Sequence, residues 1–260
     1  MLISISEILD KSWNAYTSKF REFVPYMGLL FVPILLIGSL GLAIELIMAE
    51  GMAPGLSLLL IGVLAIVIGV FLMWSFMALT RVLREVAQGQ PLSHYKQHLS
   101  GTKHLIWPLI YTSLLSGLII FGGTLLLVVP GIIFGVWYSF ANYAVTLDEK
   151  KGMEALRFSK QLVSGRWWAI LFRLFVPAFL AGLAIGVLQA IVAWAIGVLV
   201  VQFAAPDSVV FMFVYQLVSA IFSVLLYPLS TLFIVYLYES AKANPVAAPA
   251  SPAPTSPTMA

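Results

Sequence analysis

The sequence predicts an all-α protein: a polytopic membrane helical bundle with six transmembrane helices in three hairpins and with cytoplasmic amphipathic helices. The first observation is composition, because 61% of the 260 residues are hydrophobic and only 10% are charged, whereas soluble domains carry about 25% charged residues. The second is a series of long segments without a charged side chain. The third is the distribution of Lys and Arg between the connections that join these segments.

The longest uncharged segment runs from Leu105 to Leu147 and contains 43 residues. A charged side chain in the middle of a bilayer costs about 3 kcal/mol, and one spanning helix needs about 20 apolar residues. The segment therefore predicts two helices joined by a tight turn. Pro130 and Gly131 are predicted to form this turn, because proline cannot continue a helix and glycine accepts positive φ.

The other spans follow from the remaining uncharged segments. They are predicted at residues 23–44, 51–80, 174–206 and 208–238, and the second helix of the central hairpin is predicted at 132–147. The 33 residues from 174 to 206 would form a helix of about 50 Å, although the hydrocarbon core is only about 30 Å thick. Three alternatives stay open for residues 191–206: they cross the bilayer, re-enter it or lie on its outer face.

The charges predict the orientation. With six spans, 13 of the 14 Lys and Arg residues fall in the amino-terminal segment, two connections and the carboxyl-terminal segment, and the remaining one, Arg173, begins the fifth span. The other side holds only Glu45, Glu50 and Asp207. The positive-inside rule therefore predicts that both termini are cytoplasmic. Residues 1–242 are predicted to form one membrane domain, and the Pro/Ala-rich residues 243–260 a disordered cytoplasmic tail.

Two charged segments beside the spans are predicted to form amphipathic helices. In residues 1–22, Ser4 and Glu7 have the spacing of a capping box. Residues 152–164 carry an apolar stripe, which is predicted to lie in the inner leaflet; packing on other cytoplasmic segments is the alternative. The predicted lipid-interface residues are cations and indoles in or next to these segments: Lys11, Lys19, Arg21, Lys150, Lys151, Arg157, Lys160, Arg166, Trp167 and Trp168.

A series of short motifs resembles a known family. These motifs are Val-Pro-Gly-Ile-Ile at 129–133, Asp-Glu at 148–149, Glu-Ala-Leu-Arg-Phe-Ser at 154–159 and Gly-Arg-Trp-Trp at 165–168. They resemble the bacterial membrane-domain family that is associated with glycerophosphoryl diester phosphodiesterases, including its stand-alone uncharacterised relatives. The resemblance extends to about Lys242 and implies a bacterial cytoplasmic (inner) membrane protein. In the named enzymes the chemistry belongs to a separate soluble barrel, so the resemblance implies no catalytic residue here.

The sequence predicts neither catalysis nor a cofactor or metal site. It has no cysteine. His94 and His98 are four residues apart, but they lack the further ligands that zinc needs and are interpreted as solvated loop residues. Asp148 and Glu149 stand beside two lysines and are interpreted as a solvated helix start. The modest net charge of +3 predicts no nucleic-acid partner.

The function predicted from these features is a non-enzymatic integral membrane protein that interacts with lipids or with partner membrane proteins. The expected partners are membrane lipids, including anionic ones, and other membrane proteins or a second copy. Gly182 and Gly186 form a GxxxG pattern, which serves either packing inside the bundle or a homodimer. The alternative function is a small transporter or lipid-moving permease built from hairpin repeats, with a polar cavity. Its predicted lining residues are Tyr111, Ser113, Gln189 and Ser230.

Overall fold

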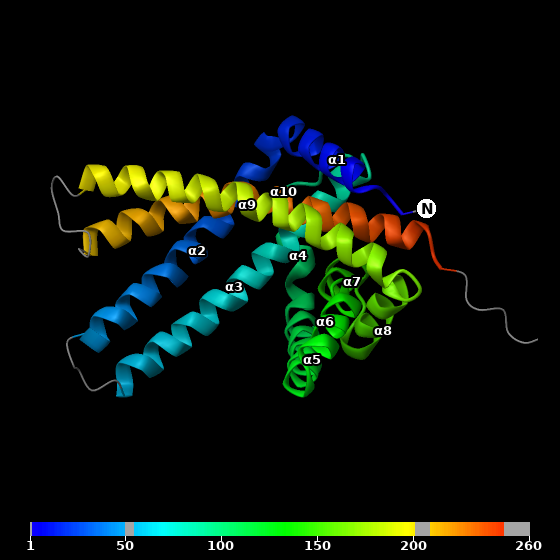
Figure 1. Ribbon diagram of the computed structural model, residues 1–260, viewed down its shortest axis with the longest axis horizontal. Helices are drawn as coiled ribbons and strands as arrows, with labels where there is room; N and C mark the ends of the chain where they lie inside the picture. Colours follow the sequence, from blue (N-terminus) through cyan, green and yellow to red (C-terminus); the bar gives the residue numbers. More distant parts are fainter. Residues whose placement is uncertain (1, 50–54, 201–208, 247–260) are drawn as a thin grey trace, which may run out of the picture.

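The computed structural model describes residues 2–49, 55–200 and 209–246. Within these ranges the secondary structure is helical, with no strand. Six stretches of the described chain are long and apolar enough to cross a membrane. The predicted all-α fold with six membrane-length helices is therefore confirmed for this part of the protein (Figure 1).

The described chain contains long helices and short helical elements. The long ones are α2 (Phe20–Ala49), α3 (Gly55–Ala87), α5 (Ile106–Leu126), α9 (Trp167–Val200) and α10 (Val209–Ala243). The short ones are α1 (Ile5–Ser18), α4 (Tyr95–Thr102), the 3-10 turn η1 (Lys103–Leu105), α6 (Val128–Trp137), α7 (Ala141–Asp148) and α8 (Gly152–Val163).

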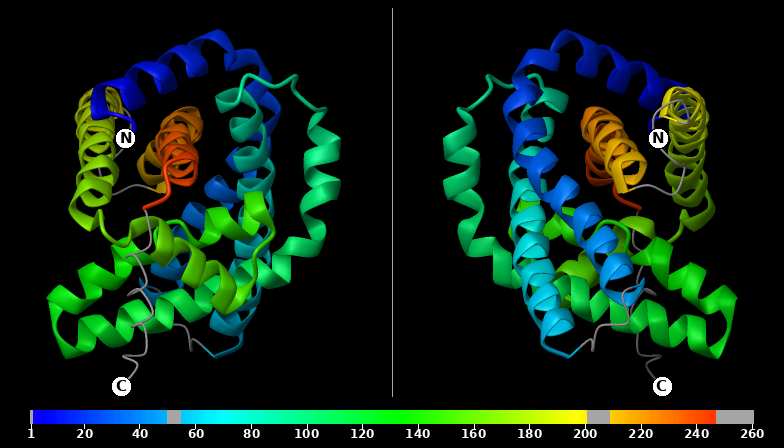
Figure 2. Two further views of the ribbon diagram at one scale, coloured as in Figure 1. Left: turned by 90° about the vertical axis from the view of Figure 1, so that its right-hand side faces the viewer. Right: turned by 90° about the vertical axis from the view of Figure 1, so that its left-hand side faces the viewer.

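The six membrane-length stretches pair as three hairpins, in which α2 contacts α3, α5 contacts α6, the first helix of the stretch Val128–Asp148, and α9 contacts α10. The hairpins diverge from the region where α3 contacts both α7 and α10 (Figures 1 and 2). Away from this region the apolar side chains face outward: Leu59 is 61% exposed, Leu126 80% and Trp194 72%. Such surfaces suit hydrocarbon, because lipid tails are as apolar as the side chains themselves.

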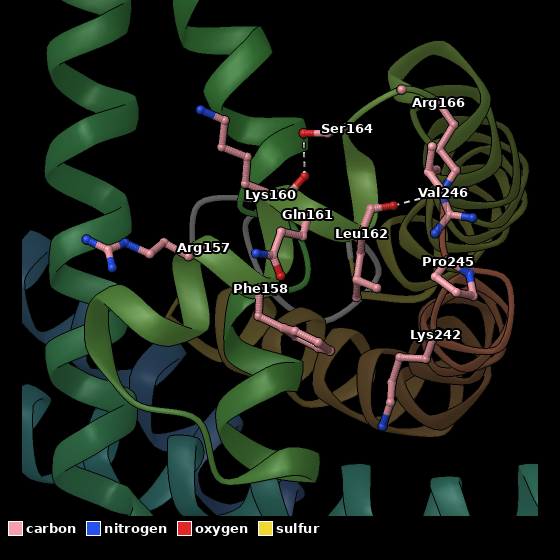
Figure 3. A pocket seen from close by; sticks show the side chains of 11 residues that line it. Arg157, Phe158, Lys160, Gln161, Leu162, Ser164, Arg166, Lys242, Pro245 and Val246 are labelled. Carbon is pink, nitrogen blue, oxygen red and sulfur yellow. Dashed lines mark hydrogen bonds between the residues drawn. The ribbon is translucent and has the colours of Figure 1, made fainter. Parts of the chain in front are cut away.

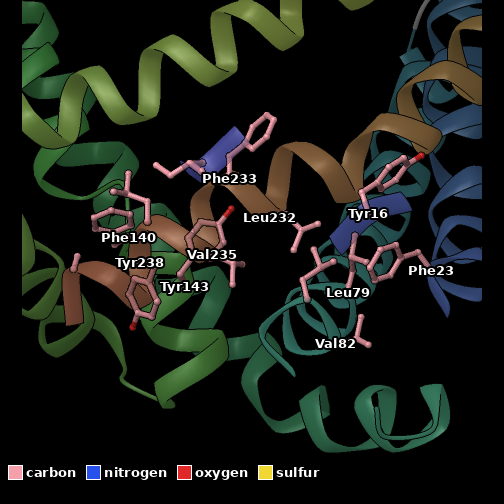
Figure 4. Packing of buried hydrophobic residues seen from close by; sticks show 14 of the residues in the cluster. Tyr16, Phe23, Leu79, Val82, Phe140, Tyr143, Leu232, Phe233, Val235 and Tyr238 are labelled. Atoms are coloured by element: carbon pink, nitrogen blue, oxygen red, sulfur yellow. The ribbon is translucent and has the colours of Figure 1, made fainter. Parts of the chain in front are cut away.

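The hydrophobic core lies where the hairpins meet. Phe23 of α2, Leu79 of α3 and Leu232 of α10 are fully buried there (Figure 4). In the same cluster the rings of Phe140 and Tyr238 lie 5.6 Å apart between centroids, a separation at which aromatic pairs attract. Burial of these large side chains holds the three hairpins together where they meet.

The amino-terminal helix begins as predicted but ends early. The Ser4 hydroxyl oxygen accepts a hydrogen bond from the Glu7 backbone N–H at 3.1 Å, so Ser4 caps α1. Residues 1–22 do not form one helix, because α1 ends at Ser18 and the chain bends at Lys19 before α2 begins. The bend directs α2 away from α1.

The predicted turn at Pro130 and Gly131 is wrong. Leu127, with an extended backbone (φ −162°, ψ 149°), separates α5 from α6. Pro130 lies in the first turn of α6, where its missing N–H costs no helical hydrogen bond. Gly131 is helical, and a Cβ on it would lie 2.1 Å from Oγ1 and 3.0 Å from Cα of Thr124 on α5. Gly131 is therefore needed for the close approach of the two helices rather than for a turn.

This geometry predicts opposite effects for glycine substitutions in one hairpin. Gly131→Ala and Gly123→Ala are expected to lower the free energy of unfolding by about 1–3 kcal/mol, as overpacking does, because a Cβ on Gly123 would lie 2.6 Å from the Phe134 ring. Gly122→Ala and Gly135→Ala are the matched controls, because their Cβ atoms would meet nothing within 4 Å. The controls should be neutral or stabilising by about 1 kcal/mol. Thermal unfolding in detergent measures all four, and equal effects at the four positions would contradict this packing.

The second helix of the central hairpin is interrupted. One helix was predicted over 132–147, but the structure has two helices there, α6 and α7, separated by a turn at 138–140. Ser159 of α8 holds this turn, because its hydroxyl accepts a hydrogen bond from the Phe140 N–H at 3.1 Å and donates one to the Trp137 carbonyl at 2.7 Å. A side chain distant in sequence satisfies the backbone groups that the interruption frees.

The remaining predictions concern the last hairpin and the tail. Helix α9 continues through Trp194 to Val200 without a break, and residues 201–208 lie outside the described ranges. A Cβ on Gly182 or Gly186 would meet nothing within 4 Å. Of the two alternatives for this pair, packing inside the bundle is therefore wrong. Helix α10 ends at Ala243, and most of the predicted tail, residues 247–260, also lies outside the described ranges.

Candidate functional site

Helix α8 carries two of the predicted lipid-interface residues, Arg157 and Lys160, and five others lie directly before or after it in the chain. Glu154 lies in its first turn and Lys160 in its last, where a carboxylate and an ammonium complement the helix dipole. Gly152 begins the helix with a φ of 51°, and Gly165 follows it with a φ of 79°. Both values are left-handed and favour glycine. The local sequence therefore sets both ends of α8.

The apolar stripe of α8 is buried against protein. Ala155, Leu156 and Val163 are at most 1% exposed, and the helix contacts α5 and α7. Met153, at 50% exposure, is an exception. The prediction that the stripe faces lipid is therefore wrong, and the alternative, that it packs on neighbouring segments, is confirmed. What α8 presents outward is its cationic side.

The cations of α8 and of the two residues before it differ in their partners. Lys150 Nζ lies 2.7 Å from Glu154 Oε1 and 4.8 Å from the centroid of the Phe158 ring. Lys160 Nζ lies 4.3 Å from the centroid of Trp137, a contact that attracts the ammonium without neutralising its charge. Within the described ranges, three cations of this segment have no ion-pair partner: Lys151, Arg157 and Lys160.

A cavity of about 850 Å³ lies beside α8 and the end of α10 (Figure 3). Its lining residues are Arg157, Phe158, Lys160, Gln161, Leu162, Ser164, Gly165, Arg166, Lys242, Pro245 and Val246. Phe158 and Leu162 form its α8 wall, whereas Arg157 and Lys160 extend from α8 on the side away from α10 (Figure 3). We call this the basic cavity, because four of its lining residues are Lys or Arg.

A second cavity, of about 700 Å³, adjoins the first. Its lining residues are Val129, Ile132, Ile133, Trp137, Ser164, Gly165, Trp167, Trp168 and Leu171. We call this the indole cavity. Trp168 is 66% exposed, and the Trp167 indole N–H donates a hydrogen bond to the Ile133 carbonyl at 3.4 Å. The structure thus brings the predicted interface residues Trp167 and Trp168 together with Trp137, which sequence analysis had not connected with them.

Arg166 has a structural role that the sequence did not indicate. Its guanidinium donates hydrogen bonds to the carbonyls of Ala241 and Asn244, at the end of α10, and to that of Leu162. Burial lowers the pKa of Arg166. Terminal helix carbonyls lack partners in their own helix, so Arg166 caps α10 and joins it to the segment after α8. Its side chain is less available to a ligand than that of Lys160.

The predicted cations near the amino terminus lie apart from these cavities. Lys11 pairs with Glu7 at 2.8 Å, and their hydrogen bond lowers the pKa of Glu7 and raises that of Lys11. Lys19 and Arg21 are exposed. Helix α1 itself packs on α10, where the Tyr16 hydroxyl donates a hydrogen bond to the Leu225 carbonyl at 2.8 Å.

Sequence analysis missed a cluster of charges, the polar hub, formed by Arg81, Arg84, Asp148, Glu149, Glu239 and Lys242. Asp148 accepts hydrogen bonds from the Tyr238 hydroxyl and, at 2.7 Å, from Lys242 Nζ. Its Oδ1 lies 3.3 Å from Arg84 Nη2, and its side chain is only 16% exposed. The interpretation of Asp148 as a solvated residue is therefore wrong. The spacing of Arg81 and Arg84, which places both on one side of a helix, was the available signal.

The second half of the polar hub is more exposed. Arg81 Nη2 donates a hydrogen bond to Glu149 Oε1 at 2.9 Å, and the Glu149 side chain is 54% exposed. Burial acts to raise the pKa of Glu149, but the hydrogen bond and charge of Arg81 outweigh it, so this pKa lies below its ordinary value. Arg84 Nε lies 2.9 Å from Glu239 Oε1. The hub thus ties α3, α7 and α10 together.

The two histidines of the connection between α3 and η1 have different surroundings. His94 is exposed and caps α4. His98 is only 6% exposed, and its Nε2 lies 3.3 Å from Glu85 Oε2, so the interpretation of His98 as solvated is wrong. Glu85 also accepts hydrogen bonds from the N–H and hydroxyl of Ser93, each at 2.9 Å. Within the described ranges no group of three or more His, Asp or Glu residues could hold a metal ion.

Two of the four polar residues of the transporter alternative make hydrogen bonds within the fold. Ser113 of α5 is hydrogen-bonded to Asn142 at 3.1 Å, and the Ser230 hydroxyl donates to the Tyr227 carbonyl of its own helix at 2.9 Å. Tyr111 is 59% exposed. None of the lining residues of the basic and indole cavities belongs to this set.

Comparison of the chain with protein-family models, with curated proteins and with solved structures found no match.

Proposed function

We propose that this protein is a multi-pass membrane protein of the bacterial cytoplasmic membrane that acts by binding anionic lipids, without enzymatic chemistry. The observation that carries the proposal is the charge of the α8 segment: Lys151, Arg157 and Lys160 have no ion-pair partner within the described ranges. This segment leads directly into the exposed indole of Trp168. Indoles favour the membrane–water interface, and each cation near an anionic surface contributes about 1 kcal/mol of attraction.

Two further arguments support this function. With both termini in the cytoplasm, α8 lies on the side where anionic lipids create a negative surface potential. The resemblance to the membrane-domain family implies the same membrane. Because the apolar stripe of α8 is used in protein packing, lipid recognition depends on charge and on the indoles rather than on insertion of the helix.

Lipid retention tests this proposal. The protein is reconstituted in nanodiscs of phosphatidylethanolamine and phosphatidylglycerol at about 4:1, extracted in mild detergent, and its retained lipid is quantified by mass spectrometry. We expect the phosphatidylglycerol fraction to exceed that of the nanodisc. The excess should fall as salt is raised, because surface attraction is screened within about 8 Å at physiological salt.

The test variant and its matched control replace residues on the same predicted side of the membrane. Replacing Lys151, Arg157 and Lys160 with Gln should remove most of the excess. Replacing Lys96 and Lys103 with Gln, exposed cations of α4 and η1, should preserve it. Wild-type protein whose retained lipid has the nanodisc composition would contradict the proposed function.

A further inference from the structure

The basic and indole cavities adjoin each other, and together they make one candidate site. Both are lined by Ser164 and Gly165, so they meet at the turn between α8 and α9. Their volumes, about 850 and 700 Å³, each lie within the range of about 300–1,000 Å³ typical of ligand sites. Gly165 lies in this turn with a φ of 79°, a left-handed value that favours glycine.

Polarity changes along this site. One end carries Arg157 and Lys160. The indole cavity is lined by the rings of Trp137 and Trp168. The far end is lined by Val129 and Ile132, near the turn of the α5–α6 hairpin. A cationic end, an aromatic middle and an aliphatic end match an amphiphile with an anionic head group.

Lys160 connects the two cavities. It lines the basic cavity, and its ammonium lies 4.3 Å from the centroid of Trp137, which lines the indole cavity. The ring orients this ammonium but supplies no negative charge. A phosphate beside Lys160 would therefore face an ammonium that has no ion-pair partner among the described residues, with Arg157 about one turn away on the same helix.

We propose that one anionic glycerophospholipid binds here, with its phosphate at Lys160 and Arg157 and one acyl chain in the indole cavity. This inference deepens the proposed lipid-binding function and rests on it. Charge complementarity favours lipid over the chain's own carboxyl-terminal segment as the occupant, because residues 247–260 contain no Asp or Glu. The site thus binds one lipid specifically, in addition to the lipids that the surface charge gathers.

Native mass spectrometry of the full chain, released from the same mixed nanodiscs, tests the site. We expect one phosphatidylglycerol to remain bound to the wild type. K160Q should weaken its retention about fivefold and R157Q/K160Q roughly thirtyfold, from about one cation–phosphate attraction per residue. Lys160→Arg should restore retention. K151Q is the matched control, because Lys151 is exposed and lines neither cavity, and it should retain the lipid.

The apolar half is tested separately. Trp168→Ala should weaken retention severalfold, whereas Trp194→Ala, which removes an equally exposed indole near the other end of α9, should not. Millimolar glycerol 3-phosphate should leave the lipid bound. Displacement by it would assign the site to a soluble anion and overturn the proposal. Truncation after Val246 should leave retention unchanged, and lipid that appears only after truncation would show that the tail is the occupant.

The result also separates this inference from the proposed function. If the wild type retains excess phosphatidylglycerol that K160Q, R157Q/K160Q and Trp168→Ala all leave unchanged, the specific site is wrong while lipid binding stands. If the wild type retains no excess, the proposed function fails, and the specific site fails with it.

Discussion

Replacing Asp148 with alanine is expected to lower the free energy of unfolding by about 3 kcal/mol. Its carboxylate accepts hydrogen bonds from Tyr238 and Lys242 and lies beside Arg84, and its side chain is only 16% exposed. Removing one member of a buried charge network costs about 3–5 kcal/mol, because the opposite charges are left without a partner in a poorly solvated site. Because Tyr238 and Lys242 belong to α10 and Arg84 to α3, the loss should loosen the junction of the hairpins.

The neighbouring residue provides the control for this prediction. Glu149→Ala removes the same charge one position later, but the Glu149 side chain is 54% exposed, and exposed ion pairs contribute about 1 kcal/mol or less. Chemical unfolding of both variants in detergent micelles gives the comparison. Equal losses would show that the network around Asp148 has no special role, and D148N should fall between wild type and Asp148→Ala because its amide oxygen still accepts a hydrogen bond.

The orientation of the chain predicts an all-or-none labelling result. Because the protein has no cysteine, single cysteines introduced at chosen positions are unambiguous reporters. Gln97→Cys and Met153→Cys lie in the segments rich in Lys and Arg, which the positive-inside rule places in the cytoplasm. A membrane-impermeant maleimide should label them only after permeabilisation. Gly51→Cys and Ser208→Cys lie at the first residues of two predicted spans, next to the connections predicted to be external, and should be labelled in intact cells.

Labelling of Gln97→Cys or Met153→Cys in intact cells would contradict this topology, because it would place the segments rich in Lys and Arg outside the cell. It would also remove one argument for lipid binding by α8, because the surface potential of anionic lipids belongs to the cytoplasmic leaflet. A reporter at Met153 is suitable because its side chain is 50% exposed, so the label needs no unfolding of α8. The exposed side chain of Gln97 has the same advantage.

The sequence predicted the membrane-length helices well, because the exclusion of charge from hydrocarbon acts on each segment independently. The uncharged run from Leu105 to Leu147 contains a hairpin, as its length requires. Its turn was misplaced because Pro130 and Gly131 are compatible with the first turn of a helix, so local preference did not distinguish a turn from a helix start. Only the closeness of Gly131 to Thr124 shows what that glycine permits.

For the candidate site, the sequence identified which residues are cationic or aromatic but not which of them are free. The amphipathic pattern of α8 is the same whether its stripe meets lipid or protein, and the tertiary structure decides for protein.

By itself the sequence determined the helices and the unequal distribution of charge, because these depend on the solvation of individual segments. The tertiary structure decided which cations find partners: Arg166 caps α10 and Lys242 pairs with Asp148, whereas Lys160 lies over an aromatic ring and has no ion-pair partner among the described residues. Such pairings join residues separated by many positions in the chain. They depend on how the hairpins pack against one another, and no local sequence pattern specifies that packing.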